Sequence, residues 1–275
     1  MPSVETPSWL VAGPPAVLTL VVSLIGIGSY GLGNDEYATW HASTLSFPDL
    51  FRLLDHQDAL LGPSYLTMHA WIELAGDGAG HMRAPSAAAM ACAAALVALI
   101  GRRLFDPLTG LGAGLVFAVI PSTSSYGQEA RPYAFAVAGV LLATLLLLRA
   151  IDVPSWSRWA WYGAALLVVG LSHVVALTVL LAHAVLVWRD VRAGPDGLLR
   201  RWFVATAVPV LVLLPLVVKG STQASSIAWI KADAHAVQNF PERLFGSSTV
   251  ALIVIVLALV AGAAMAGKER RPAVL

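Results

Sequence analysis

The chain has 275 residues, of which 58% are hydrophobic and only 12% are charged, and its formal net charge at pH 7 is +1. A soluble domain carries about 25% charged residues, so this composition, with a mean hydropathy of +0.75, predicts an all-α polytopic membrane protein. The near-zero charge and the lack of a large Lys/Arg cluster argue against a nucleic-acid partner. The single cysteine, Cys92, excludes a disulfide within the chain.

Apolar runs without charges predict about eight helices that cross or nearly cross the membrane, in one transmembrane domain over residues 1–275. The predicted spans are approximately 16–33, 84–100, 108–125, 132–148, 159–171, 174–188, 202–218 and 249–266. The N-terminal residues lack the basic start of a cleaved signal peptide, so we expect the first span to be retained. The spans 159–171 and 174–188 are separated by Ser172 and His173 and are predicted to form a short hairpin.

The distribution of basic residues predicts the orientation of these helices. With a cytoplasmic N-terminus, and with the weaker apolar segment 62–76 lying on the outer surface or re-entrant, 11 of the 17 Lys and Arg residues face the cytoplasm. The same topology places 10 of the 16 acidic residues outside. We therefore expect a multi-pass protein of the cell membrane whose active site, if it has one, is extracytoplasmic.

Two adjacent acids, Asp35 and Glu36, directly follow the first apolar run. An ionised group inside hydrocarbon costs roughly 3 kcal/mol, so the pair is expected at the membrane surface. Residues 35–44 are predicted to form a short helix, and Ser46-Phe47-Pro48-Asp49 is typical of the start of another. The segment 35–76 is thus expected to hold surface helices, two of them short, amphipathic and parallel to the membrane.

A second outer loop connects the spans 108–125 and 132–148. Pro132 is expected to open the later helix. Arg131 then lies at a helix N-terminus, where free backbone N–H groups would also stabilise an anion.

Five short motifs follow one another along the chain. They are Asn34-Asp35-Glu36, Gly62-Pro63-Ser64-Tyr65, Arg83-Ala84-Pro85-Ser86, Gly101-Arg102-Arg103-Leu104-Phe105 and Gln128-Glu129-Ala130-Arg131-Pro132-Tyr133-Ala134. With this ordered set the chain resembles the C-type (GT-C fold) membrane glycosyltransferases, most closely the protein O-mannosyltransferase and aminoarabinose-transferase group and its actinobacterial mannosyltransferase-like members. The resemblance covers nearly the whole chain and implies a GT-C-like helix bundle. Ser64-Tyr65 departs from the double aromatic that follows the proline in many relatives. Most relatives also exceed 275 residues, so the resemblance leaves open a fragment, a split gene product or a truncated relative.

The resemblance implies transfer of a mannose-like sugar from a polyprenyl-phosphate lipid to a hydroxyl of an acceptor protein, glycan or lipid. Asp35 matches the catalytic aspartate of the family and would be the general base, while Glu36 would assist it or position the acceptor. Arg131 would stabilise the departing phosphate. Four further residues are expected to line the substrate cavity: Glu129, Tyr65, His173 and Tyr133.

No cofactor is expected, although Asp55, His56, Asp58 and His81 could offer ligands to a divalent metal without a recognised spacing. Each site residue also has a simpler interpretation. The acids could cap a loop helix, Arg131 could snorkel at a span end, and the hydrogen bonds of His173 could be satisfied inside the bundle.

Two other functions stay open: an inactive, truncated relative that acts as a lipid-binding scaffold, and a transporter of a lipid-linked substrate. The transporter is disfavoured because the deep positions are nearly all apolar and the chain has no evident internal repeat.

Overall fold

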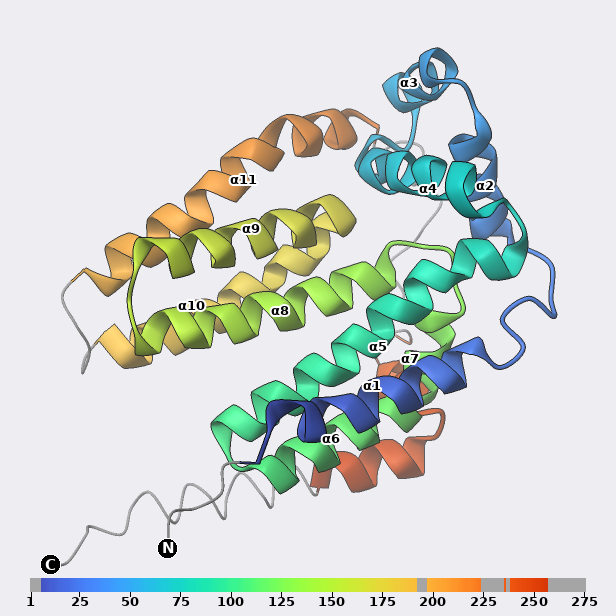
Figure 1. Cartoon of the computed structure of the whole chain (residues 1–275). Coiled ribbons are helices and arrows are strands. Elements are labelled where there is room, and N and C mark those ends of the chain that lie inside the picture. Colours follow the sequence, from blue (N-terminus) through green and yellow to red (C-terminus); the bar gives the residue numbers. More distant parts are fainter. Residues whose placement is uncertain (1–5, 192–196, 224–234, 236–237, 257–275) are drawn as a thin grey trace, which may run out of the picture. The chain divides into compact units, whose positions relative to one another are not determined.

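The computed structural model describes residues 6–191, 197–223, 235 and 238–256, and among these it contains helices and no strand (Figure 1). The predicted all-α fold class is confirmed. The chain separates into two compact units, the first made of residues 1–119 and 123–229, the second of residues 120–122 and 230–275. The helices of the first unit carry the candidate site.

The described residues form the following helices. In chain order they are α1 (Ser8–Leu24), α2 (Asn34–Thr44), α3 (Phe47–His56), the 3₁₀ turn η1 (Ala59–Leu61), α4 (Gly62–Ala75), α5 (Ala79–Leu104), α6 (Pro107–Val119), α7 (Pro121–Gly127), α8 (Tyr133–Asp152), α9 (Trp156–Ser172), the 3₁₀ turn η2 (Val174–Thr178), α10 (Val179–Val191), α11 (Leu198–Thr222) and, in the second unit, α13 (Phe240–Phe245). Residues 248–256 are also helical.

Three helices of the described residues are long and apolar enough to cross a membrane: α5, α8 and α11. The bent pair α6 and α7 would make a fourth, and two shorter apolar helices, Ser8–Leu24 and Val174–Trp188, fall below the length of a full span. These helices fit the predicted class of membrane protein. The number of eight spans stays a prediction, and residues 257–266 of the last predicted span lie outside the described residues.

Two predicted spans differ from the observed helices. The first helix covers Ser8–Leu24 rather than 16–33. It includes Pro14 and Pro15 and ends where Gly26 adopts a φ of +69°, a conformation that glycine adopts without steric cost. The predicted span 108–125 is broken at Ile120 and bends by 66° between α6 and α7, because the ring of Pro121 disfavours a helical conformation of the residue before it.

The helix breaks where the sequence predicts the turn of the hairpin, and the crossing of the membrane by its two arms stays a prediction. Helix α9 ends at Ser172, and His173 is extended, with φ −158° and ψ 104°. The turn η2 and helix α10 then bring the chain back beside α8 and α11 (Figure 1).

The short helices predicted after the first apolar run are present as α2 and α3, with one correction. Ser46 caps α3 by accepting a hydrogen bond from the backbone N–H of Asp49, as the sequence predicts, and Leu50 on its apolar face is fully buried. Helix α2 is not amphipathic in the expected sense. Its buried residues are Glu36, Thr39, Ala42 and Ser43. Three of these four are polar, and Ala42 alone among them packs in an apolar cluster, with Leu50 and Tyr65.

Helix α5 is the central element of the first unit, where it packs against α1, α6 and α8 (Figure 1). Helices α8 to α11 form a second group around the buried side chains of Trp159, Tyr162 and Leu166. Helices α2 and α4 pack on each other, and α2 follows the loop that ends near the start of α5. The N-terminal ends of α2, α5 and α8 are thereby brought together.

Candidate functional site

The start of α2 is fastened to the rest of the unit by the buried carboxylate of Glu36, whose side chain is 6% exposed. One oxygen accepts hydrogen bonds from Nε of Arg83 and the backbone N–H of Ala130, both at 2.8 Å. The other accepts from Nη2 of Arg83 at 2.7 Å and from the backbone N–H of Gly33 at 2.9 Å. Burial disfavours the charge, but these hydrogen bonds outweigh it and hold the pKa of Glu36 below its ordinary value. A carboxylate has about four acceptor positions, so the protein itself saturates Glu36.

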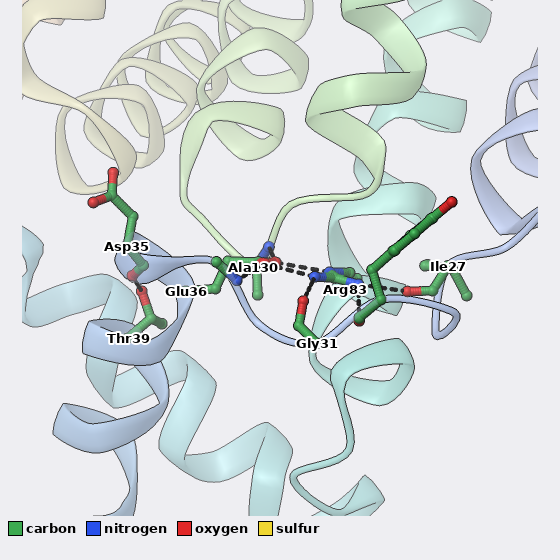
Figure 2. A network of polar contacts seen from close by, with 9 residues as sticks. Ile27, Gly31, Asp35, Glu36, Thr39, Arg83 and Ala130 are labelled. Atoms are coloured by element: carbon green, nitrogen blue, oxygen red, sulfur yellow. Dashed lines mark hydrogen bonds and ion pairs between the residues drawn. The ribbon is translucent and has the colours of Figure 1, made fainter.

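Arg83, near the start of α5, is saturated as well. Its guanidinium has five N–H donors, and those not used by Glu36 go to the loop after α1. They reach the carbonyl oxygens of Ile27 at 2.8 Å, Tyr30 at 3.1 Å and Gly31 at 2.9 Å (Figure 2). One buried ion pair therefore joins the loop after α1 to the starts of α2, α5 and α8.

Asp35, the residue before Glu36, has the opposite environment. Its side chain is 71% exposed and points away from the network of Glu36 and Arg83 (Figure 2). Its carboxylate lies 3.8 Å from Nη2 of Arg131. Because Glu36 is hydrogen bonded to Ala130, the residues next to each of them, Asp35 and Arg131, are held face to face.

Arg131 differs from Arg83 in having unused donors, although its side chain is only 11% exposed. Nη1 makes two long contacts of 3.4 Å, to the backbone oxygen of Asp35 and to the hydroxyl of Thr39. Nε is buried and has no hydrogen-bond partner among the residues that the structure describes. Burial opposes the charge, but Tyr133 and Asp35 keep the pKa of Arg131 above its ordinary value. A buried guanidinium with unused donors is suited to bind an oxyanion.

Two hollows meet at Arg131. The first, of about 480 Å³, lies between η1, the start of α8, the break after α9 and the end of α11. Its polar lining residues are Asp58, Arg131, Tyr133, Ser172, His173, Ser221 and Gln223. The second, of about 420 Å³, lies among α4, α5, α8 and α9, and shares Arg131 and Ser172 with the first. Asp35 is not among the lining residues of either hollow and reaches them through Arg131.

Residues 63–218, more than half of the chain, match the model of the dolichyl-phosphate-mannose-protein mannosyltransferase family. The chain belongs to this family. It is accordingly a membrane glycosyltransferase of the mannosyltransferase type, and the predicted resemblance to the C-type enzymes is confirmed. No curated protein and no solved structure matches the chain significantly. Arg83, Arg131, half of the lining of the first hollow and all of the lining of the second lie in the matched range, whereas Asp35 and Glu36 precede it.

An aromatic wall borders the first hollow of this mannosyltransferase-family chain. The ring of Tyr133 lies 5.6 Å from that of His173 and 5.9 Å from that of Tyr126, and the guanidinium of Arg131 lies 5.8 Å from the centre of the Tyr133 ring. Burial and the charge of Arg131 lower the pKa of His173, which favours the neutral imidazole. Flat faces with polar edges of this kind suit a sugar ring. Tyr133 and His173 thus lie where the sequence predicts a cavity.

Tyr65 supports this hollow from behind instead of lining it. It is 1% exposed, packs with Ala42 and Leu50, and donates a hydrogen bond of 3.0 Å to the carboxylate of Asp58. Asp58 itself lines the first hollow. The prediction that Tyr65 lines the cavity is therefore wrong, because Tyr65 lies behind Asp58, which lines it.

Glu129 is half-buried just before Ala130 and Arg131. Burial raises its pKa above the ordinary value, and the like charges of Glu36 and Asp35 add to this against the opposing effect of Arg131. Glu129 is thus less readily ionised than an ordinary glutamate.

The residues considered for a metal do not converge. Asp55 pairs with Lys219 at 3.0 Å, and Asp58 accepts the hydrogen bond of Tyr65. Among the described residues, no group of three or more His, Cys, Asp or Glu side chains could hold a metal ion.

Two contributions to the site have no signal in the local sequence. Arg83 belongs to a motif, but its partner Glu36 lies 47 positions away. Gln223 joins the end of α11 to α3 and η1, since it accepts from the backbone N–H of Ala59 at 2.9 Å and donates to the backbone oxygen of Leu54 at 2.8 Å. No local pattern predicts contacts between residues so far apart in the chain.

Proposed function

We propose that this chain transfers a mannose-like sugar from a polyprenyl phosphate to an acceptor hydroxyl at the extracytoplasmic face of the cell membrane. The main support is the pairing of Arg131, which has unused donors, with the exposed acid Asp35 at the edge of a hollow of about 480 Å³. Membership in the mannosyltransferase family supports the class of reaction.

In the proposed reaction Asp35 is the general base. The acceptor oxygen forms a bond to the anomeric carbon of the sugar, Asp35 takes the proton of the acceptor hydroxyl, and the bond between the anomeric carbon and the phosphate oxygen breaks. The electron pair of that bond leaves with the lipid phosphate. An exposed carboxylate can be reached by an acceptor, and general base catalysis of this kind contributes about 10²–10⁴ in rate.

Arg131 stabilises the leaving phosphate in this scheme. Negative charge accumulates on the phosphate as the bond to the sugar breaks, and donors held in place in a poorly solvated site favour that charge. The unpaired Nε and the long contacts of Nη1 leave donors for this purpose. Tyr133 and His173, beside Arg131 in the lining, are placed to position the sugar. Glu129, which the sequence predicts in the cavity, is not among the lining residues of either hollow.

Glu36 has a different role from the catalytic helper that the sequence suggests. Its four hydrogen bonds leave it without a free acceptor position. We assign it as a positioning residue, because its bond to Ala130 sets the distance between Asp35 and Arg131.

The test compares Asp35→Asn with Asp49→Asn in isolated membranes that are supplied with radiolabelled polyprenyl-phosphate mannose. Asp49 is a partly exposed acid of the same outer loop that pairs with Arg52, so its variant controls for loss of an outer-loop charge. We expect Asp35→Asn to lose transfer at least about 100-fold while it still binds the donor, and Asp49→Asn to retain transfer.

Wild-type transfer by Asp35→Asn would overturn the assignment of the base. Arg131→Gln should weaken binding of the donor phosphate and slow its departure, whereas a donor affinity equal to that of the wild type would contradict the role of Arg131. Donor binding without any turnover by the wild-type protein would favour the lipid-binding scaffold instead.

A further inference from the structure

A third hollow, of about 500 Å³ and distinct from the two at Arg131, lies where α5 and α8 end and α9 begins. Its lining residues are Arg103, Leu146, Arg149, Asp152, Arg158 and Trp161. Three guanidinium groups from three helices therefore surround a space to which one carboxylate contributes.

The charges around this hollow are not balanced. Arg103 forms an ion pair with Asp152 and donates a hydrogen bond of 3.0 Å to the backbone oxygen of Leu148. Arg158 donates a hydrogen bond of 3.0 Å to the backbone oxygen of Arg149, and the like charges of Arg149 and Arg158 act on Arg103. With one carboxylate among three guanidiniums, an anion in the hollow would relieve this repulsion.

The hollow is separate from the site at Arg131. Arg83 and Arg103 lie near opposite ends of α5, about 30 Å apart at the rise of an α-helix. Arg131 precedes α8, whereas Arg149 lies in its last turn. No residue of the sugar-transfer site contributes to the lining of this hollow.

Exposed apolar side chains of α8 and α9 lie next to the three arginines of this hollow. On α8, Leu142 and Leu146 lie seven and three positions before Arg149 and so share its face, and Leu142 is 39% exposed. On α9, which packs against α8, Trp161 is 65% and Val168 is 51% exposed. These two residues are seven positions apart and also share a face.

This combination of charge and apolar surface decides between two sources of the anion. A soluble phosphate would use only the arginines, whereas a phospholipid would also cover the apolar faces of α8 and α9. Tryptophan is enriched at the boundary between lipid tails and headgroups, and basic residues at that level attract anionic lipids.

We propose that Arg103, Arg149 and Arg158 bind the phosphate headgroup of an anionic phospholipid, in the leaflet opposite the Arg131 site, with its acyl chains along α8 and α9. This site is independent of sugar transfer.

Native mass spectrometry of the full-length protein in detergent tests the proposal, with phosphatidylglycerol and phosphatidylcholine of matched chains as probes. The test variant is Arg149→Gln with Arg158→Gln. The control is Arg102→Gln, which removes the same type of charge from the end of α5 outside the hollow. Each arginine near an anionic lipid contributes about fivefold in affinity, so we expect the double variant to bind phosphatidylglycerol about 25-fold more weakly. The control should retain wild-type affinity.

Equal loss in Arg102→Gln and in the double variant would overturn the site, as would equal retention of the two lipids by the wild type. Displacement of phosphatidylglycerol by an equal concentration of glycerol 1-phosphate would also overturn it, because the ligand would then be a soluble anion. Arg158→Gln alone supplies the measurement if the double variant does not fold, and unchanged affinity of that variant would count against the proposal.

Discussion

The adjacent acids Asp35 and Glu36 show how strongly environment separates two residues of similar chemistry. The side chain of Asp35 is 71% exposed, whereas that of Glu36 is 6% exposed and paired with Arg83. An exposed carboxylate contributes little to stability, while a buried pair that loses one partner leaves an uncompensated charge. Substitution of Asp35 should therefore affect chemistry, and substitution of Glu36 should affect the fold.

The Glu36→Gln variant tests the buried pair. An amide cannot accept four hydrogen bonds or compensate the charge of Arg83, so the free energy of unfolding should fall by about 3 kcal/mol. That loss corresponds to a fall in Tm of about 10 °C, measured as thermal aggregation of the detergent-solubilised protein. Asp35→Asn is the matched control and should unfold at nearly the wild-type temperature.

The buried pair also makes the stability of the wild type depend on pH. Folding lowers the pKa of Glu36 below its ordinary value of 4.5, so the folded state holds this proton less tightly than the unfolded chain. The stabilisation is thus complete above pH 4.5 and is lost as the pH falls through the lowered pKa. The wild type should lose this part of its stability on acidification, whereas Glu36→Gln should not. A Glu36→Gln protein with the wild-type Tm at neutral pH would contradict the importance of the pair.

At the scale of helices, glycine controls how closely α6 approaches α5. A Cβ added to Gly110 would collide with the backbone oxygen of Ala98 and with the backbone of Arg102, whereas one added to Gly112 would meet nothing within 4 Å. Small residues that let backbones approach are typical of helix contacts in membranes.

Gly110→Ala should therefore destabilise the protein by about 1–3 kcal/mol through overpacking. Gly112→Ala in the same helix should be neutral or slightly stabilising, because alanine is the better helix former. The Tm of the two variants in one detergent distinguishes the cases. Equal effects would mean that α5 and α6 are not in close contact.

The sequence predicts best the elements that depend on one local property. Helices α5 and α8 follow from long charge-free runs, and the hairpin follows from the polar pair Ser172 and His173 within an apolar stretch. The first helix was placed too late in the chain because its prolines, which normally break a helix, lie inside it. The bend before Pro121 was missed because hydropathy does not record backbone conformation.

The residues of the candidate site also differ in whether a local sequence property predicts them. Asp35 and Arg131 could be predicted because each lies at a boundary between an apolar run and a polar loop, in a motif of the family. The hydrogen bonds of Arg83 to Glu36 could not be predicted, because the sequence does not show which of several arginines reaches Glu36 across 47 positions. The inward position of Tyr65 depends similarly on its packing against Ala42 and Leu50.

At the scale of the whole molecule, arginines mark both ends of the long helices. Arg83 and Arg103 lie near the two ends of α5, at a separation of about 30 Å that matches the thickness of the hydrocarbon core. Arg131 precedes the first residue of α8 and Arg149 lies in its last turn, so arginines also mark the two ends of this helix. If both helices cross the membrane, the proposed sugar-transfer site at Arg131 and the proposed lipid site face opposite sides.

Cysteine accessibility tests this arrangement. In a Cys92→Ala background, which removes the single native cysteine, Ser125→Cys reports the side of Arg131, and Ser157→Cys reports the side of Arg158. Both serines are exposed. An impermeant maleimide added to intact cells should label only Ser125→Cys, and Ser157→Cys should react after the membrane is opened. The reverse pattern would place the sugar-transfer site in the cytoplasm and contradict the proposed face, and labelling of both cysteines in intact cells would mean that α8 does not cross. Because each variant is compared with its own labelling after denaturation, poor expression of either one cannot imitate these outcomes.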